Sequence, residues 1–343
     1  MNRKLVIRQA ISLVVGGQDL SREMAGMVME EITEGKVTGS QSGAFLAAMQ
    51  VKGPSPGEIA EFSRVMRSRA VPVCTGHSGT LLDTCGTGGD GMASFNISTA
   101  AAFVAAGAGV QVVKHGNRSV SSRCGSADVL EKLGVNLSVS PSCTNEIMKE
   151  IGIAFLYAPL YHPVMEKVAV TRREIGIRTI FNLLGPLTNP AGADAQLIGV
   201  YHPALTRVFA GVLRDLGTTR AMVVHGAGLD EITTTGETRV TELTGRLITE
   251  RTIRCNDYGF EEVGAGDIAG GDASENARIL TDVLSGEKGA HREIVLLNSG
   301  AAIYTAGKAS SIQEGITEAV RSVDNGGAMG KLNALVDATG GMV

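Results

Sequence analysis

From residue 81 onward, segments typical of strands alternate with segments typical of helices, and this alternation constrains the fold more than any other feature of the sequence. Short apolar runs at 81–85, 110–114 and 153–157 predict strands, and the apolar spacing at 97–107 and 126–133 predicts helices between them. Such alternation indicates an α/β domain with a mainly parallel central sheet. Further along the chain we expect strands at 195–201 and 221–225, and helices at 203–216, 276–285, 292–305 and 310–323.

The first seventy residues differ, because they carry helix signals and few strand signals. Ser55-Pro56-Gly57-Glu58 predicts the start of a helix: Ser55 can cap it, Pro56 suits its first position, and Glu58 completes a capping box. A chain of 343 residues has room for about two domains. We therefore expect a small all-helical domain beside a larger α/β domain.

Charge and composition exclude several classes of protein. The net charge of −4 and an aromatic content of 4% argue against a broad nucleic-acid interface, which would be basic and would stack bases on aromatic rings. The five cysteines are odd in number and form no C-x-x-C pair, so no disulfide framework or zinc site is expected and a reducing cytoplasm fits best. The uncharged stretch 91–113 is interrupted by polar residues and glycines, so we expect a buried helix and strand there and no membrane span.

Four glycines in six residues, Gly86-Thr87-Gly88-Gly89-Asp90-Gly91, lie between the strand expected at 81–85 and the helix expected at 97–107. We call residues 86–91 the glycine loop. A strand, a glycine turn and a helix N-terminus together form an anion site, because free backbone N–H groups and the positive end of the helix dipole face the same point. The sequence therefore predicts a phosphate site here.

Two other interpretations of the glycine loop stay open. Its spacing satisfies G-x-G-x-x-G, the dinucleotide pattern, but Asp90 opposes a pyrophosphate and Lys114 stands where a ribose-binding acid is expected. A tight turn without a ligand explains the glycines but not the polar side chains that follow. Those side chains are Ser94, Asn96, Ser98 and Thr99.

A second loop runs from Lys114 to Ser126 after the next expected strand. Both loops should reach the carboxyl edge of the sheet, where ligands bind in open α/β sheets. Between residues 84 and 125 the charged residues are Asp90, Lys114, Arg118 and Arg123, a local balance of +2 in an acidic chain. This predicts a basic pocket for a small polyanion.

A third element, Val223 to Glu231, places Asp230 and Glu231 after a buried strand and a glycine turn. Adjacent acids in such a place are most often a solvated turn. Beside a bound pyrophosphate they would instead suit Mg²⁺, which takes a few carboxylates together with waters and substrate phosphates. The sequence leaves open whether these acids meet the first two loops.

Several long strings occur in an order that resembles the anthranilate phosphoribosyltransferase family. They are GTGGDG with SFNIST, KHGNRSVSS with GSADVLEKLG, RREIGIRTIFNLLGPLTNPA, and HGAGLDE. The resemblance extends from about residue 5 to about residue 325 and implies transfer of phosphoribose from phosphoribosyl pyrophosphate (PRPP) to the amine of anthranilate, in tryptophan biosynthesis. A mild departure is Ser94, where the family usually has threonine; both residues offer a hydroxyl.

The resemblance also implies site residues. The residues implied for PRPP are Gly86, Gly89, Asp90, Ser94, Asn96, Ile97, Ser98, Thr99, Lys114, His115, Gly116, Asn117, Arg118, Ser119, Val120, Ser121, Ser122 and Ser126. Those implied for anthranilate are Gly86, Asn117, His162, Arg172 and Pro186, and those for magnesium, as two ions, are Ser98, Asp230 and Glu231. Lys114 is implied as catalytic, and His115 is a candidate proton acceptor or a positioning histidine.

The resemblance implies a discontinuous helical domain and a homodimer. Residues 163–190 combine a helix expected at 163–175 with Gly185-Pro186 and Asn189-Pro190, pairs that stop regular elements. In this interpretation residues 1–72 are the first segment of the helical domain, and residues 163–190 are its second segment. The α/β domain then comprises residues 73–162 and 191–343.

Cleavage of a bond to pyrophosphate creates an oxocarbenium-like centre and a highly charged leaving group, so the chemistry depends mainly on electrostatic stabilisation. Anthranilate carries an aniline nitrogen that is largely unprotonated at neutral pH, so no strong general base is required. Three alternatives remain: a pyrimidine nucleoside phosphorylase, a phosphoribosyltransferase for another aromatic amine, and a non-catalytic sensor of phosphoribosyl ligands.

Overall fold

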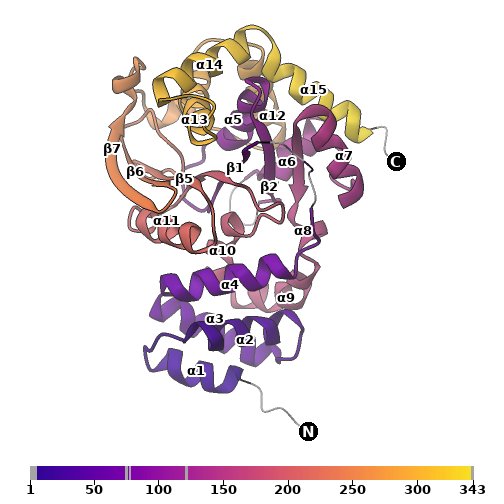
Figure 1. Cartoon of the computed structure of the whole chain (residues 1–343), viewed down its shortest axis with the longest axis vertical. Coiled ribbons are helices and arrows are strands. Elements are labelled where there is room, and N and C mark those ends of the chain that lie inside the picture. The colour runs from indigo at the N-terminus through magenta and orange to yellow at the C-terminus, as the bar shows by residue number, and fades with distance from the viewer. Residues whose placement is uncertain (1–5, 74–75, 77–78, 120–122, 341–343) are drawn as a thin grey trace.

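The computed structural model describes residues 6–73, 76, 79–119 and 123–340. Figure 1 shows a bundle of helices at one end of the molecule and an α/β unit that forms the rest. The fourth helix begins as its sequence predicts, because Ser55 accepts a hydrogen bond from the N–H of Glu58 while Glu58 accepts one from the N–H of Ser55. The first four helices are α1 (Ile7–Val15), α2 (Arg22–Thr33), α3 (Gly39–Lys52) and α4 (Pro56–Ser68).

The described strands form one seven-stranded sheet with the order β3-β2-β1-β4-β5-β6-β7. The strands from β3 to β5 in this order pair in parallel, which confirms the expected mainly parallel sheet. An antiparallel hairpin, β6 and β7, extends one edge and was not predicted. The strands are β1 (Leu81–Gly86), β2 (Gln111–Gly116), β3 (Ile153–Tyr157), β4 (Ala195–Gly199), β5 (Arg220–Gly226), β6 (Glu237–Thr244) and β7 (Leu247–Arg254).

Both faces of the sheet are covered, so neighbouring residues of one strand pack into different cores. Leu197 of β4 joins the core beneath helices such as α5 and α13, whereas Ile198 joins the core shared with α11 and the helical bundle. Every helix among the described residues is too short or too polar to cross a lipid bilayer. The remaining helices are α5 (Ile97–Gly107), α6 (Ser126–Lys132), α7 (Pro141–Ile151), α8 (Ala158–Tyr161), α9 (Glu166–Ile175), α10 (Ile180–Leu184), α11 (Leu205–Asp215), α12 (Ala273–Leu284), α13 (Ala290–Thr305), α14 (Ile312–Asp324) and α15 (Gly327–Gly340).

Helix α9 lies far along the chain from α2 and α3, yet it packs against both (Figure 1). Val168 of α9 is buried in the same core as Met29 of α2 and Phe45 of α3. The chain then returns through α10, which contacts α3 and α4. A segment remote in sequence thus completes the helical bundle.

Three expectations about local structure need correction. Strand β2 continues to Gly116, so Lys114 and His115 lie in a strand whose buried neighbours hold them, and the second loop begins later than predicted. Residues 178–190 are not wholly irregular: α10 spans Ile180–Leu184, and a short 3₁₀ helix, Gly185–Leu187, follows it. Helices α7, α8 and α15 were not predicted.

Candidate active site

The glycine loop leaves the sheet where the order of the strands reverses. Strand β1 pairs with β2 on one side and with β4 on the other, and ligands of open α/β sheets bind at such a point, beyond the carboxyl ends of the strands. The N–H of Thr87 donates to the carbonyl of Gly199 at 3.0 Å, and the hydroxyl of Thr87 accepts from the N–H of Tyr201 at 3.0 Å. The start of the loop is therefore fixed to the end of β4.

Two positions in this loop require glycine because other groups approach them closely. A Cβ at Gly86 would stand 2.3 Å from Oδ2 of Asp230. Gly89 has φ +69°, and a Cβ there would stand 1.5 Å from Nη2 of Arg178. The glycines thus allow an acid from the turn after β5 and an arginine from the segment after α9 to reach the backbone of the loop.

The paired acids Asp230 and Glu231 meet the glycine loop and the start of α5. Oδ2 of Asp230 accepts a hydrogen bond from the N–H of Gly88 at 2.7 Å, and Oε1 of Glu231 accepts one from the N–H of Ser98 at 3.1 Å. The N–H of Asp230 lies 3.4 Å from a carboxylate oxygen of Asp90. The interpretation of these acids as a solvated turn is therefore wrong, because the turn packs against the loop.

Burial of these carboxyl groups shifts their proton affinity. Burial, with the nearby charge of Asp90, raises the pKa of Asp230 to about 7. Burial, with the charge of Asp230, also raises the pKa of Glu231 well above its ordinary value. The raised pKa values mean that the protein alone does not supply enough positive charge to stabilise both groups as carboxylates.

Lys114 is the cation that faces this negative charge. Its side chain is buried, and its ammonium donates to the carbonyl of Thr84 and, at 3.2 Å, to the hydroxyl of Ser98. Burial lowers the pKa of Lys114, while the charges of Asp83 and Glu231 act in the opposite direction. The sequence predicted Lys114 at the site, but not the buried Asp83 on the neighbouring strand.

The donor set of Ser98, Asp230 and Glu231 fits a magnesium site. Mg²⁺ prefers oxygen ligands and uses a few carboxylates together with waters and phosphate oxygens of the substrate. The described residues contain no group of three His, Cys, Asp or Glu side chains arranged as a complete metal site. Partly buried carboxylates with raised pKa values would nevertheless be stabilised by a divalent cation, so these residues fit an ion that a substrate helps to hold.

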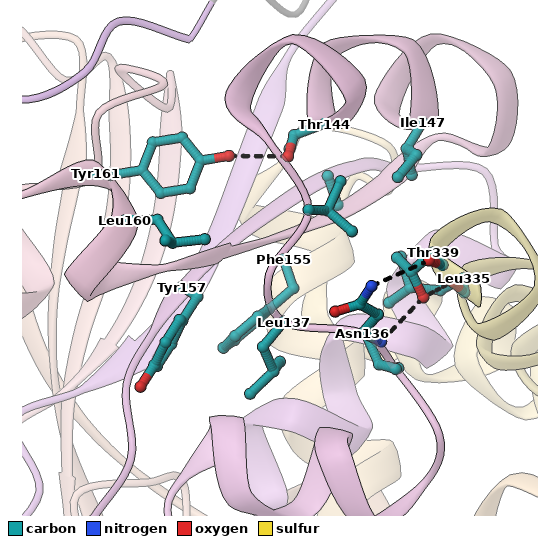
Figure 2. Close-up of a pocket in the computed structure, with 13 residues that line it drawn as sticks. Asn136, Leu137, Thr144, Ile147, Phe155, Tyr157, Leu160, Tyr161, Leu335 and Thr339 are labelled. Atoms are coloured by element: carbon teal, nitrogen blue, oxygen red, sulfur yellow. Dashed lines mark hydrogen bonds between the residues drawn. The ribbon is translucent and has the colours of Figure 1, made fainter. Parts of the chain in front are cut away.

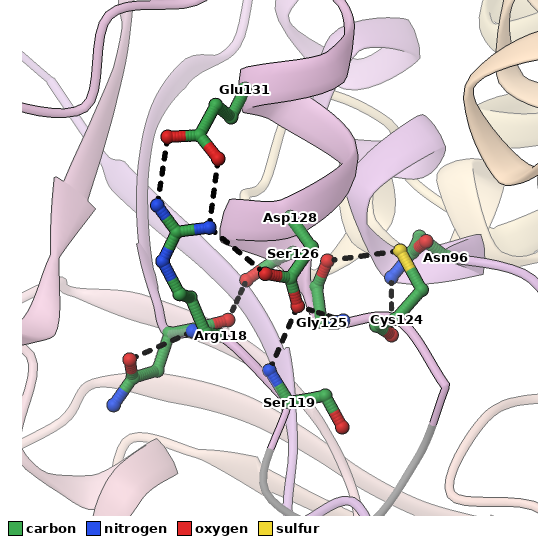
Figure 3. Close-up of polar contacts among 9 residues, drawn as sticks. Asn96, Arg118, Ser119, Cys124, Gly125, Ser126, Asp128 and Glu131 are labelled. Carbon is green, nitrogen blue, oxygen red and sulfur yellow. Dashed lines mark hydrogen bonds and ion pairs between the residues drawn. The ribbon is translucent and has the colours of Figure 1, made fainter. Parts of the chain in front are cut away.

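The expectation of a basic pocket is wrong in its charge balance. Arg118 forms ion pairs with Glu131 and Asp128 of α6, with its guanidinium 2.7 Å and 3.1 Å from their carboxylate oxygens (Figure 3). Lys114 likewise faces acids from other strands. The local excess of +2 is therefore offset by acids just outside the counted range, Asp83, Asp128 and Glu131, and by the paired acids after β5.

The second loop is also fixed through Asp128. This carboxylate accepts from the N–H of Ser119 at 3.0 Å and from the N–H of Gly125 at 2.8 Å, while the hydroxyl of Ser126 lies 3.4 Å from the carbonyl oxygen of Asn117 (Figure 3). Asn117 is exposed at the end of β2. Val120, Ser121 and Ser122 lie outside the described residues.

The residues predicted around the start of α5 divide into two groups. Ser94 and Asn96 are partly exposed, and the side chain of Asn96 bonds to the carbonyl of Cys124 at 3.3 Å and to the side-chain amide of Asn276 at 3.0 Å. Thr99 is buried. The side chain of Ile97 packs into the hydrophobic core, so it is not available to a ligand and only its backbone can face one.

A second half of the candidate site lies where the end of β2, the end of α8 and the turn at Gly185 meet. The rings of His115 and His162 lie 5.1 Å apart, and both are buried. Burial lowers the pKa of His115 to about 3 and that of His162 to about 4, so both rings are neutral near pH 7. The carbonyl of Pro186 is occupied, since it accepts from the side chain of Gln196 at 3.0 Å.

Arg172 projects from α9 without an acidic partner among the described residues. Its guanidinium carbon lies 5.4 Å from the ring centre of Phe181, and burial lowers its pKa. Among the described residues, no hydrogen bond or ion pair joins Arg172 to Asn117 or to the glycine loop. The fold therefore leaves a partly buried cation available to an anionic ligand.

Figure 2 shows a different hollow, between β3, α7 and the end of α15. No charged residue lines it, and its polar groups bond to each other: the hydroxyl of Tyr161 donates to Thr144 at 2.8 Å, and the N–H of Asn136 donates to Thr339 at 3.1 Å. This hollow does not suit a polyanion, so the candidate site remains at the glycine loop.

Arg178 is the main residue of the site that the sequence analysis missed. It donates to the carbonyls of Gly88 and Gly89, and its guanidinium carbon lies 4.1 Å from the ring centre of Tyr201. Arg178 belongs to the string RREIGIRTIFNLLGPLTNPA, but that string by itself does not show which of its arginines reaches the loop.

Comparisons with known proteins agree with the architecture. Residues 8–70 match the glycosyl transferase family, helical bundle domain, and residues 78–329 match the glycosyl transferase family, a/b domain. Anthranilate phosphoribosyltransferase of Methanosphaerula palustris is 51% identical over 337 residues, which cover 98% of this chain and 99% of that protein. The enzyme of that name from Anaeromyxobacter sp. is 52% identical over 334 residues, which cover 97% and 99%.

Solved structures show the same similarity in three dimensions. Anthranilate phosphoribosyltransferase from Thermus thermophilus matches with a TM-score of 0.90 and 42% identity, over 96% of this chain and 99% of that one. The enzyme from Saccharomyces cerevisiae, in complex with PRPP and Mg, matches with a TM-score of 0.90 and 27% identity, over 98% of both chains. The resemblance carried by the sequence motifs is thus confirmed, and this chain belongs to the anthranilate phosphoribosyltransferase family.

Proposed function

We propose that the site at the glycine loop is where this chain carries out its family's activity in tryptophan biosynthesis. The 5-phosphoribosyl group passes from PRPP to the amine of anthranilate, giving N-(5-phosphoribosyl)anthranilate and pyrophosphate. The observation that carries this assignment is the meeting of the glycine loop, Lys114 and the paired acids Asp230 and Glu231 where the strand order reverses. Backbone N–H groups, a buried cation and oxygen ligands for magnesium suit a sugar pyrophosphate.

Ligands of the relatives support both halves of the reaction. One Saccharomyces cerevisiae structure is a complex with PRPP and Mg, and another is a complex with 4-fluoroanthranilate. We assign the donor to the glycine loop, the start of α5 and the second loop. The assigned donor residues are Gly86, Gly89, Asp90, Ser94, Asn96, the backbone of Ile97, Ser98, Thr99, Lys114, His115, Gly116, Asn117, Arg118, Ser119 and Ser126.

Ser98, Asp230 and Glu231 hold magnesium in this assignment, as two ions. When bound, the metal neutralises charge on the pyrophosphate and so makes it a better leaving group. The ammonium of Lys114 lies beside the hydroxyl of Ser98 and adds a fixed positive charge in a buried place, where its electrostatic effect is larger than in water.

The acceptor half needs position more than proton transfer. The amine of anthranilate is neutral at pH 7, and its nitrogen must be held close to the sugar carbon that loses pyrophosphate. Gly86, Asn117 and Arg172 bind anthranilate, and the guanidinium of Arg172 pairs with its carboxylate. His162 and Pro186 shape the route by which it enters.

His115 is assigned a positioning role. Burial keeps its pKa at about 3, which opposes storage of a proton on this ring. His162 lies 5.1 Å away and is also neutral near pH 7. Two neutral rings can orient an aromatic acceptor without competing with Arg172 for its carboxylate.

The assignment extends to the whole molecule. We place the helical domain in residues 1–72 and 163–190, because α9 packs against α2 and α3, and the α/β domain in residues 73–162 and 191–343. The enzyme is a homodimer of the cytoplasm in this proposal.

One experiment tests the proposed reaction. Anthranilate is fluorescent, so its signal should fall when PRPP and magnesium are added to the purified chain, and should stay constant if either is omitted. Phosphorolysis of thymidine or uridine would instead support a pyrimidine nucleoside phosphorylase. Binding of PRPP without loss of anthranilate would support a sensor.

A further inference from the structure

Arg178 connects the segment after α9 to the backbone of the glycine loop. Its Nη2 lies 2.5 Å from the carbonyl oxygen of Gly89 and 3.3 Å from that of Gly88. The same guanidinium stacks over the ring of Tyr201, with 4.1 Å between the guanidinium carbon and the ring centre. Tyr201 is itself fixed, because its N–H donates to the hydroxyl of Thr87. Arg178 is thus held between the loop and the chain that follows β4.

The two carbonyls that Arg178 holds determine where the next N–H groups point. In a trans peptide the N–H lies opposite the carbonyl, and no described residue follows a cis bond. With both carbonyls turned toward Arg178, the N–H groups of Gly89 and Asp90 point away from it. No described residue accepts a hydrogen bond from either N–H, whereas the N–H of Gly88 is occupied by Asp230. Two donors are therefore free to bind a ligand.

We propose that Arg178 is a positioning residue for the phosphoribosyl donor: it holds the carbonyls of Gly88 and Gly89 and thereby aims the N–H groups of Gly89 and Asp90 at the donor's pyrophosphate. This inference rests on the proposed function, in which the glycine loop binds PRPP. It deepens that function because a residue of the segment after α9, the helix that carries Arg172, sets the direction in which the N–H groups of the glycine loop point.

The geometry favours arginine over lysine at this position. A planar guanidinium can donate to two carbonyls and stack on an aromatic ring at the same time, whereas a lysine ammonium cannot stack in the same way. Gly89 completes the arrangement, since a Cβ there would overlap the guanidinium. A side chain at either position that breaks this fit would let the peptide planes of the loop rotate.

The test compares Arg178→Ala and Arg178→Lys with the wild type. We expect Arg178→Ala to lower kcat/KM for PRPP by about 10- to 100-fold, as for the loss of other residues that orient binding groups, and to leave the KM for anthranilate unchanged. Arg178→Lys should recover part of this loss. The affinity for magnesium with inorganic pyrophosphate, measured by calorimetry, should weaken from wild type to Arg178→Lys to Arg178→Ala. Added guanidinium should partly restore the activity of Arg178→Ala.

Arg246→Ala is the matched control, because Arg246 is exposed in the turn between β6 and β7 and should behave as wild type. Tyr201→Leu keeps Arg178 but removes the stacked ring, and it should show a smaller loss in kcat/KM for PRPP. This variant tests the inference if Arg178→Ala does not fold. Equal changes in both KM values, or an unchanged kcat/KM for PRPP in folded Arg178→Ala, would overturn the inference. If the wild type itself does not bind magnesium with pyrophosphate, the proposed function fails instead.

Discussion

The two halves of the candidate site handle charge in opposite ways. At the glycine loop, Asp90, Asp230 and Glu231 lie close to the buried ammonium of Lys114, so charged groups of both signs are packed together. On the acceptor side, the rings of His115 and His162 are neutral, and Arg172 is a cation without an acidic partner among the described residues. One half is crowded with charges of both signs, whereas the other combines neutral rings with arginines, Arg172 and Arg67, the latter bound to the carbonyl of Leu187.

This difference corresponds to the chemistry of the two substrates. A pyrophosphate leaving group carries several negative charges, so it needs cations, and those cations need acids to hold them in a buried place. An aromatic amine with one carboxylate needs positive charge for that carboxylate and neutral walls for its ring. The predictions that follow test whether each half acts on its own substrate.

The largest effect should come from removal of the paired acids. We expect Asp230→Asn with Glu231→Gln to lower kcat at least about a thousandfold, because the ligands of a metal worth several kcal/mol are lost. The normal dependence of the rate on magnesium should disappear, which a titration of activity with the metal would show. An unchanged titration in the folded variant would remove these acids from the metal site.

Lys114→Ala should have the next largest effect. Loss of one preorganised electrostatic contact lowers the rate by about 100-fold, a few kcal/mol in transition-state stabilisation. Single-turnover kinetics would locate the loss in the chemical step, with Lys308→Ala, an exposed lysine, as control. If Lys114→Ala kept activity within about twofold of wild type, the electrostatic role proposed for Lys114 at the glycine loop would be contradicted.

Arg172→Ala tests the acceptor side. We expect the KM for anthranilate to rise about 10- to 100-fold, because a charge-assisted hydrogen bond to its carboxylate contributes about 1.5–3 kcal/mol. The KM for PRPP should change much less, which steady-state kinetics with each substrate varied would show. Equal effects on both substrates would mean that the two halves are not separate.

The smallest effect concerns His115 and the pH dependence of stability. Its pKa is about 3 in the folded chain against an ordinary value of 6.5, so the unfolded chain takes up the proton first as the pH falls. The contribution of His115 is therefore complete above pH 6.5 and is lost progressively toward pH 3. Compared with His115→Asn, the free energy of unfolding of the wild type should fall more steeply, by up to about 1.4 kcal/mol per pH unit.

Urea unfolding at several pH values between about 7 and about 5 would measure this difference. The comparison with His115→Asn is needed because the raised pKa of Asp230 acts in the opposite direction: its contribution is lost as the pH rises toward about 7. Parallel pH profiles for wild type and variant would show that the ring of His115 is not kept neutral by burial.

The sequence predicted the elements that depend on short-range patterns. The capping box at Ser55 and the strand before the glycine loop both appear where expected. Some missed elements carried comparable signals. Ser140 caps α7 ahead of a proline at its first position, and exposed and buried side chains alternate over residues 237–240 at the start of β6.

The charge of the site could not be predicted in the same way. Counting charges along residues 84–125 gives +2, but Asp83 and the α6 acids just outside this window already offset the count, and only the acids of the turn after β5 are remote in sequence. Arg178 was missed for the same reason. Nothing in its immediate sequence indicates that it reaches Gly88 and Gly89.

By itself, the sequence determined the helical and α/β parts of the chain and the family, because capping, side-chain periodicity and motif strings are local along the chain; the glycine loop as an anion site stays a prediction. Only the tertiary structure decided that Asp230 contacts Gly88, 142 positions away, and that Arg178 lies behind the loop. These contacts depend on the order of the strands, which places the ends of β1, β4 and β5 side by side. That order follows from how the whole sheet buries its two faces, and no local pattern contains it.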